Sequence, residues 1–183
     1  MGHRLSKIYT RTGDAGTTGL GDGSRTGKDA ARIDAMGDVD EVNSLLGVLL
    51  CEELPAEVRG LITGIQHDLF DLGGELSVPG AAFLKPGQPA RLEAAIDRYN
   101  AELLPLKEFI LPGGSRTGAL AHLARATCRR AERVVVGLAQ TEPVSAAARQ
   151  YLNRLSDLLF VLARWLNKAA GGGDVLWQKG KNA

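Results

Sequence analysis

A segment rich in glycine, threonine and aspartate, KIYTRTGDAGTTGLGDG, occupies residues 7–23 of the chain. Glycine has no Cβ and reaches backbone conformations that other residues avoid, so this segment can turn several backbone N–H groups toward one point. N–H groups gathered in this way can hold a phosphate. The same composition is also typical of a mobile surface loop, and composition alone leaves both interpretations open.

The residues after this segment do not complete a known phosphate-binding motif. Gly27 and Lys28 form a Gly-Lys pair, but Gly21 precedes Gly27 by one residue too many for a P-loop. Asp29 also stands where a P-loop has Ser or Thr. The dinucleotide-binding fingerprint fails because no parallel-strand pattern surrounds the glycines. A phosphate bound here would therefore belong to neither of these folds.

The sequence shows no recognisable metal or nucleophile motif. The histidines lack a partner at HExxH spacing, and the Glu-x-x-His pairs of a di-iron bundle are missing. No Ser-His-Asp or Cys-His arrangement can be argued either. We therefore look for binding chemistry among the arginines.

A run of arginines, RATCRRAERVV at residues 125–135, lies within a predicted helix. At about 100° per residue, one side of this helix carries His122, Arg125, Arg129, Glu132 and Arg133. The other side carries Leu120, Leu123, Thr127, Ala131, Val134 and Leu138. A charged stripe is often only the solvated face of an amphipathic helix, but the planar guanidinium fork of arginine suits phosphate or carboxylate.

The following helix has a comparable polar face. Its members are Arg149, Asn153, Ser156 and Asp157, and they lie opposite a row of leucines. Asn and Asp have low helix propensity and often need a partner. If the two polar faces meet near the glycine-rich segment, they form an anion clamp with hydrogen-bonding groups for a sugar or a base.

Five predicted helices position these residues. Apolar spacing places them at residues 33–50, 55–76, 90–104, 117–140 and 144–170. Helices of this length with short connections predict an all-α, antiparallel five-helix bundle. The helix at 144–170 has apolar residues on more than a narrow stripe, which indicates that one face packs against a second subunit. Strand signals are nearly absent, and only SKIYT at residues 6–10 has the pattern of a short strand.

We expect one domain over residues 1–183, made of three parts. Residues 1–29 form an N-terminal segment, residues 30–170 form the bundle and residues 171–183 form a tail. The tail either packs through Val175, Leu176 and Trp177 or is disordered.

Composition narrows the class of protein. A formal net charge of +1 argues against a dedicated nucleic-acid binder. No apolar stretch is long enough for a membrane span and no signal peptide is evident, so we expect a soluble, cytoplasmic protein. Cys51 and Cys128 both have apolar sequence neighbours, and we expect buried, reduced thiols.

Five motifs together resemble the PduO-type ATP:cob(I)alamin (corrinoid) adenosyltransferases. The N-terminal segment with Lys28, then GDVDEVNS, FILPGG, RATCRRAERVV and YLNRLSDLLFVLAR, occur in the order and approximate spacing of that family. The resemblance covers residues 5 to 170. It implies a five-helix bundle assembled as a homotrimer, with each active site between neighbouring subunits.

The resemblance also implies site residues. On the N-terminal segment, ATP contacts would come from Thr10, Arg11, Thr12, Gly13, Thr18, Gly19 and Lys28. The facing subunit would add Arg129, Arg130, Glu132, Arg133 and Asn153. Asp40 would pair with Arg125 across the interface, and Phe109 and Asp157 would face the corrin. No protein ligand set is implied for Mg²⁺, which would be held mainly by the ATP phosphates.

The implied reaction explains why these residue types are needed. The cobalt of cob(I)alamin attacks the 5′ carbon of ATP, so adenosylcobalamin forms and tripolyphosphate leaves. Lys28, Arg129, Mg²⁺ and backbone N–H groups would stabilise that leaving group. Phe109 would exclude the lower ligand of cobalt and so ease the reduction of Co(II).

The reaction implies partners, and two other functions remain open. The partners are a cob(II)alamin reductase and an adenosylcobalamin-dependent acceptor enzyme. One alternative is a carrier or sensor that binds cobalamin and ATP without transferase activity. The other is a purely structural bundle, for which Mg-ATP would not stabilise the fold.

Overall fold

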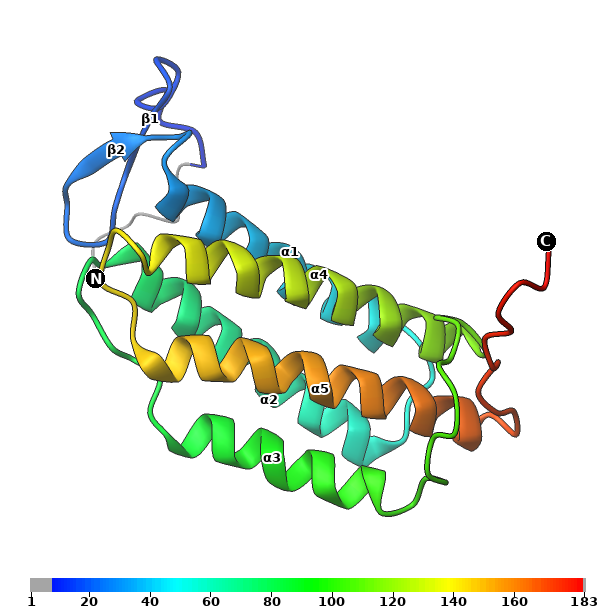
Figure 1. Ribbon diagram of the computed structural model, residues 1–183. Helices are drawn as coiled ribbons and strands as arrows, with labels where there is room; N and C mark the ends of the chain where they lie inside the picture. The colour runs from blue at the N-terminus through cyan, green and yellow to red at the C-terminus, as the bar shows by residue number, and fades with distance from the viewer. Residues whose placement is uncertain (1–7, 183) are drawn as a thin grey trace.

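The computed structural model describes residues 8–182 and consists almost entirely of helices (Figure 1). A two-stranded antiparallel ribbon precedes the helices and pairs Thr18 with Thr26 at its centre. In chain order the elements are β1 (Thr17–Gly19), β2 (Arg25–Gly27), α1 (Ala31–Leu50), α2 (Ala56–Ser77), α3 (Gly87–Asn100), α4 (Arg116–Leu138) and α5 (Ala146–Ala169).

The five helices form an antiparallel bundle, which confirms the predicted fold class. In Figure 1, α1, α3 and α5 run in one direction while α2 and α4 run in the other. Helix α1 packs against α2 and α4, and α5 packs against α3 and α4. The β1–β2 ribbon lies at the end of the bundle where α1 begins. The connection between α3 and α4 and the C-terminal tail lie at the opposite end.

Two serines fix where the last two helices begin. The Ser115 hydroxyl accepts a hydrogen bond from the Gly118 N–H at 3.0 Å, and the Ser145 hydroxyl accepts one from the Ala148 N–H at 3.0 Å. Each bond satisfies a backbone donor that the first helical turn leaves without a partner. Consequently α4 and α5 start within two residues of the predicted positions.

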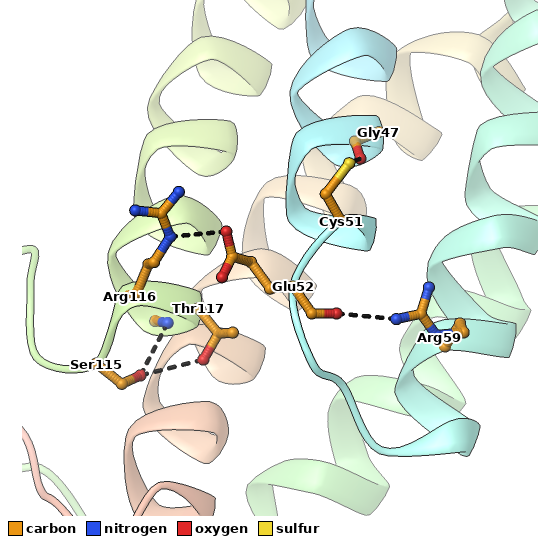
Figure 2. Close-up of polar contacts among 8 residues, drawn as sticks. Gly47, Cys51, Glu52, Arg59, Ser115, Arg116 and Thr117 are labelled. Atoms are coloured by element: carbon orange, nitrogen blue, oxygen red, sulfur yellow. Dashed lines mark hydrogen bonds and ion pairs between the residues drawn. The ribbon is translucent and has the colours of Figure 1, made fainter.

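A set of contacts ties the start of α4 to the end of α1 (Figure 2). The Arg116 Nε donates to Glu52 Oε1 at 2.7 Å. The Arg59 guanidinium, on α2, donates to the backbone oxygens of Leu50 and Glu52, each at 2.8 Å. These bonds hold three helix ends together beside the α3–α4 connection.

Helix α5 is buried on more than one face by α3 and α4 of the same chain, so its broad apolar pattern does not by itself require the predicted second subunit. Leu152, Leu155, Leu159, Leu162 and Leu166 are all buried in the core. On another face the Tyr151 hydroxyl donates to Asp68 Oδ2 at 2.8 Å, and Arg91 forms an ion pair with the same carboxylate. Burial, together with the nearby Asp68 carboxylate, raises the pKa of Tyr151. The hydroxyl therefore stays protonated and keeps donating.

The ribbon differs from the sequence prediction. Residues 8–10 form no strand, and the other two residues of SKIYT lie outside the described part of the chain. The strands form instead at residues 17–19, inside the glycine-rich segment at residues 7–23, and at residues 25–27, just after it. The Arg25 guanidinium braces the ribbon by donating to Thr12 O at 2.8 Å and to Thr17 Oγ1 at 2.6 Å.

The prediction of two buried thiols is half wrong. Cys128 is buried, and burial raises its pKa. Cys51 is exposed, because it caps the C-terminus of α1 where the chain leaves the bundle. Within residues 8–182, no helix has the length and apolar character needed to cross a bilayer.

Candidate functional site

The N-terminal segment brings a lysine ammonium against a glycine. A Cβ added to Gly13 would lie 3.1 Å from Lys28 Nζ and 3.1 Å from the backbone oxygen of Thr17. Both distances are shorter than most Cβ contacts, so a side chain at residue 13 would crowd the lysine ammonium in its present position. The structure therefore places these two predicted ATP-contacting residues together.

The remaining predicted residues of this segment are exposed, except for Thr18, which is half-buried. Thr10 Oγ1 and Thr12 Oγ1 are 2.8 Å apart, and between them Arg11 adopts a φ of 62°. Such a φ is uncommon for a residue other than glycine and points to a tight local turn. Thr18 and Gly19 belong to β1. Polar groups on this surface are thus available to a ligand.

The ribbon is docked on the end of α2. The Gly21 N–H donates to the backbone oxygen of Ser77 at 2.7 Å. A Cβ on Gly21 would lie 2.7 Å from a methyl carbon of Val78, so this close approach requires glycine. Asp22 accepts hydrogen bonds from the N–H and hydroxyl of Ser24, and these bonds lower the pKa of Asp22. The segment thus has a defined conformation between residues 13 and 28.

The arginines of α4 separate into two groups. Arg130 forms ion pairs with Asp38 and Glu41 of α1, and these bonds raise the pKa of Arg130. Arg129 and Arg133 are exposed, and the Arg133 guanidinium donates to the backbone oxygen of Arg129 at 3.0 Å. Of the three α4 arginines predicted to bind ATP, Arg129 and Arg133 therefore remain open to a ligand, while Arg130 is engaged within the chain.

The polar faces of α4 and α5 meet, which the sequence left open. Asn153 Nδ2 donates to Glu132 Oε1 at 3.0 Å, and Arg154 donates to Asn153 Oδ1 at 2.7 Å. Arg154 is in turn paired with Glu93 of α3 at 2.7 Å. The Asn153 side chain is therefore held by partners on both sides. Asp157 lies one turn further along α5 and is exposed.

A second site lies at the opposite end of α4. A cavity of about 520 Å³ is lined by Leu106, Lys107, Glu108, Phe109, Ile110, Pro112, His122, Arg125 and Phe160. The Phe109 side chain is 76 % exposed, so most of its surface is available to a ligand. The Arg125 guanidinium carbon lies 5.9 Å from the centre of the Phe160 ring. The cavity thus combines an apolar wall with two cationic side chains, Lys107 and Arg125, and one carboxylate, Glu108.

His122 departs from its predicted place on the polar face. It is only 3 % exposed, whereas Leu123, assigned to the apolar side, is 51 % exposed. The packed face of α4 is rotated relative to the prediction, because α1 and α5 cover it from two directions. Burial, and to a lesser extent the nearby Arg125, lowers the pKa of His122. The imidazole is therefore neutral at pH 7.

Sequence reasoning missed Phe160 altogether. It lies seven residues after Asn153, close to two helical turns, and therefore on nearly the same side of α5. This spacing could have identified it as a residue of the site. Its ring packs edge-on against His122, with ring centres 6.1 Å apart. Phe160 therefore forms part of the wall that faces Phe109.

The predicted Asp40–Arg125 pair does not form within the chain. Asp40 lines a groove of about 490 Å³ between α1 and α2, together with Ile33, Met36, Leu69 and Phe70. Arg125 instead lines the cavity beside Phe109. Phe70 is 73 % exposed in this groove, a large fraction for so apolar a side chain.

The two halves of the predicted site lie at opposite ends of one chain. The glycine-rich segment adjoins the start of α1 (Figure 1), and Phe109 lines a cavity with His122 and Arg125 near the start of α4. Helix α4 spans most of this separation, and its 23 residues measure about 35 Å at a rise of 1.5 Å per residue. One copy of the chain therefore cannot close both halves around a single small molecule.

The chain is similar to proteins that handle cobalamin. The sequence model of the cobalamin adenosyltransferase family matches residues 8–166. A cobalamin adenosyltransferase from Cupriavidus metallidurans is 65 % identical over 180 residues, covering 98 % of both chains. A corrinoid adenosyltransferase from Mycobacterium tuberculosis is 46 % identical over 192 residues, covering 98 % of this chain and 97 % of the relative.

Solved structures of the Lactobacillus reuteri PduO-type ATP:corrinoid adenosyltransferase have the same fold. A phenylalanine-to-alanine variant complexed with cobalamin and ATP is 33 % identical, with a TM-score of 0.89 over 94 % of this chain and 100 % of that one. An arginine-to-lysine variant complexed with ATP is 34 % identical, with a TM-score of 0.89 over 93 % and 100 %. The two substituted positions are 20 residues apart in that protein, and the same interval separates Phe109 from Arg129 here.

Proposed function

Because this chain belongs to the cobalamin adenosyltransferase family, we propose that its N-terminal segment binds ATP and its Phe109 cavity binds the corrinoid. The chain is an ATP:corrinoid adenosyltransferase. It transfers the 5′-deoxyadenosyl group of ATP to the cobalt of cob(I)alamin, and the products are adenosylcobalamin and tripolyphosphate. The observation that carries this conclusion is the 65 % identity to a cobalamin adenosyltransferase over 98 % of both chains.

In this proposal the triphosphate is held by positive groups from two surfaces. Lys28, which lies beside Gly13, and the backbone N–H groups of the segment meet the phosphates on one side. Arg129 and Arg133 meet them on the other, because both are exposed. Glu132 and Asn153, already joined by a hydrogen bond, are placed to contact the ribose or the base.

The corrin is assigned to the cavity at the other end of the chain. Phe109 is largely exposed there and can cover the lower face of the corrin, where it keeps water and the nucleotide tail away from cobalt. Asp157 is exposed on α5 and would contact the rim of the corrin. The matching 20-residue interval supports the assignments of Phe109 to the corrin and of Arg129 to ATP.

The complete site is proposed to lie between copies in a homotrimer. The separation of the two halves within one chain supports this proposal, because a second copy would bring them together. The exposed apolar groove around Phe70 supplies a surface for that contact, and burying such a side chain contributes about 1.5–3 kcal/mol. Asp40 in this groove would pair with Arg125 of the neighbouring copy.

The reaction needs positioning and charge rather than proton transfer. The electron pair of Co(I) forms the bond to the 5′ carbon of ATP, while the bond from that carbon to the triphosphate oxygen breaks. The electrons of the broken bond leave on tripolyphosphate, so the cations that surround it stabilise the transition state. No group has to remove a proton, and the buried, neutral His122 is compatible with that requirement.

Mg²⁺ is proposed to enter with the nucleotide. Within residues 8–182, no three His, Cys, Asp or Glu side chains are grouped so that they could hold a metal ion. Mg²⁺ is commonly bound by substrate phosphates with few protein ligands, and this arrangement is compatible with that mode. The ion would neutralise part of the phosphate charge.

Partner enzymes follow from the chemistry of the substrates and products. Cob(I)alamin must be supplied by a one-electron reductase of cob(II)alamin. Adenosylcobalamin must pass to an enzyme that uses it. The carrier or sensor alternative is less well supported, because the relatives are named as transferases.

One anaerobic assay tests the proposed function. Purified protein is mixed with cob(I)alamin and Mg-ATP, and the corrin spectrum and tripolyphosphate release are followed together. We expect equal amounts of adenosylcobalamin and tripolyphosphate. A corrin spectral shift without tripolyphosphate would identify a carrier, and the absence of thermal stabilisation by Mg-ATP would identify a structural bundle.

A larger residue at position 13 should weaken ATP binding. In Gly13→Val the new side chain occupies the space of Lys28 Nζ, so the ammonium must move. A hydrogen bond to a charged group contributes about 1.5–3 kcal/mol, so we expect the KM for ATP to rise about tenfold or more. Steady-state kinetics at saturating cob(I)alamin measure this change. Gly64→Ala serves as the control, because an added methyl group there contacts no other atom. An unchanged KM for ATP in Gly13→Val would show that Lys28 does not bind the phosphates.

The Asp40–Arg125 pairing can be measured as a coupling energy. Asp40→Ala, Arg125→Ala and the double variant form a cycle, read out as the free energy of trimer dissociation. If the side chains pair across the interface, we expect a coupling energy of about 1.5 kcal/mol or more. Asp71→Ala, an exposed α2 residue, replaces Asp40→Ala in the control cycle. Additive losses would show that the two residues do not meet in the assembly.

A further inference from the structure

The loop that carries Phe109 has almost no secondary structure of its own. Residues 101–115, which connect α3 to α4, contain turns and one isolated β-bridge at Ile110. A connection of this length needs contacts with the rest of the protein to keep one conformation. The position of the Phe109 ring therefore depends on what holds this loop.

Asn167, near the end of α5, holds the far end of the loop. Its Oδ1 accepts from the Ser115 N–H at 2.9 Å, and its Nδ2 donates to the Gly113 oxygen at 2.9 Å. A Cβ at Gly114 would lie 2.5 Å from the Asn167 side chain, and the φ of this glycine is 104°. The Asn167 contact therefore fixes residues 113–115 and leaves Phe109 to a second anchor.

The second anchor is a segment of the C-terminal tail, residues 174–177, which we call the C-terminal strap. The Leu111 N–H donates to the Val175 oxygen at 2.8 Å, and the Trp177 N–H donates to the Phe109 oxygen at 2.8 Å. The Trp177 ring packs edge-on against the Phe109 ring, with centres 6.4 Å apart. The strap thus contacts both the backbone and the ring of the residue assigned to the corrin.

A buried ion pair holds the strap against α5. The Arg164 Nε donates to Asp174 Oδ2 at 2.7 Å, and the side chains are only 6 % and 16 % exposed. The Arg164 Nη2 also donates to the Leu104 oxygen at 2.8 Å. One guanidinium therefore joins the strap, α5 and the start of the loop. Buried pairs of this kind depend on both partners, because removal of one leaves a charge without compensation.

We propose that Asp174 and Arg164 are positioning residues for Phe109. This inference rests on the proposed function, in which Phe109 covers the lower face of the corrin. The ion pair fixes the strap, the strap fixes residues 109–111, and the ring is thereby held where a corrin can stack on it. Loss of the ion pair should therefore affect the reduction of bound cob(II)alamin before it affects the transfer step.

Amide hydrogen exchange tests the anchor without any ligand. In Asp174→Ala we expect the N–H groups of Leu111 and Trp177 to exchange about tenfold faster or more, because the strap opens more often. The Ser115 N–H, held by Asn167, should keep its rate. Asp174→Asn retains an oxygen acceptor for Arg164 and should give a smaller change. Unchanged exchange at Leu111 and Trp177 in Asp174→Ala would overturn the anchor.

Two activity assays then test the positioning role. We expect Asp174→Ala to form adenosylcobalamin about tenfold more slowly than wild type when the assay starts from cob(II)alamin and a reductant. When cob(I)alamin is supplied, the loss of rate should be several-fold smaller. Glu57→Gln, which breaks an exposed α2–α3 ion pair, is the matched control and should behave as wild type in both assays. If the exchange experiment shows a loosened strap but the rate falls by the same factor in both assays, Asp174 does not position Phe109 for the reduction of cob(II)alamin. If the wild-type protein transferred no adenosyl group, the proposed function would fail. The exchange experiment would still show whether the Asp174–Arg164 ion pair holds the strap.

Discussion

Replacement of Arg129 by alanine is expected to reduce turnover about 100- to 1000-fold, the range found when one preorganised charge-stabilising group is removed from a site. The leaving tripolyphosphate carries several negative charges, and Arg129 is exposed without a partner carboxylate in an ion pair among the described residues. Its charge is therefore available to the ligand. The measurement is kcat for cob(I)alamin and Mg-ATP under anaerobic conditions.

The control for this variant is an arginine of similar exposure on another helix. Arg98→Ala removes an exposed guanidinium of α3 that pairs with Glu57, and its kcat should match wild type. Circular dichroism and thermal unfolding should show that Arg129→Ala remains folded, because a solvent-exposed side chain adds little to stability. A folded Arg129→Ala protein with the wild-type kcat would contradict the role of Arg129 in leaving-group stabilisation.

Phe109→Ala is expected to separate the two stages of the reaction. With cob(II)alamin and a reductant, the rate should fall about tenfold or more, because each 59 mV lost from a one-electron potential costs a factor of ten in the equilibrium. With cob(I)alamin supplied directly, the loss should be several-fold smaller, since the electron has already been delivered. The two rates are measured on the same preparation, so that each assay serves as the control for the other.

The stability of the variant gives a second check. Phe109 is largely exposed, so its removal should leave the free energy of unfolding nearly unchanged, unlike the loss of about 3–5 kcal/mol for a buried phenylalanine. The same factor of loss in both assays would mean that the ring acts on corrin binding or on transfer, and not on the cobalt's lower face.

The helices could be predicted because their apolar residues recur with helical period and their ends carry clear signals. Pro55 directly precedes α2, and Gly171, with a φ of 75°, follows the end of α5. Helix α3 spans residues 87–100, so the predicted range of 90–104 lies three to four residues late. Pro86 in fact sits at the N-cap of that helix.

The strands and the orientation of α4 could not be predicted for different reasons. Each strand has three residues with no apolar alternation, and the ribbon is held by contacts such as Arg25 with Thr12 that leave no periodic pattern. For α4, helical spacing predicts which side is apolar. It does not predict how much of the helix surface the neighbouring helices cover. His122 and Leu123 lie at the edges of that side, so packing alone decided which was buried.

The candidate site was predictable by residue type and only in part by position. The contact of Glu132 with Asn153 and the approach of Lys28 to Gly13 agree with the predicted groupings. The engagement of Arg130 with α1 depends on carboxylates that the arginine run itself does not reveal. Phe160 was missed because a phenylalanine inside an apolar helix has the same pattern as core packing.

The separation of the glycine-rich segment from Phe109 within one chain has a consequence for enzyme concentration. If each site is completed by a neighbouring copy, a dissociated chain keeps its core but has no complete site. Specific activity then becomes a function of protein concentration through mass action. Substrates that bridge two copies would also hold them together, so that ATP and corrinoid act as ligands of the assembled state.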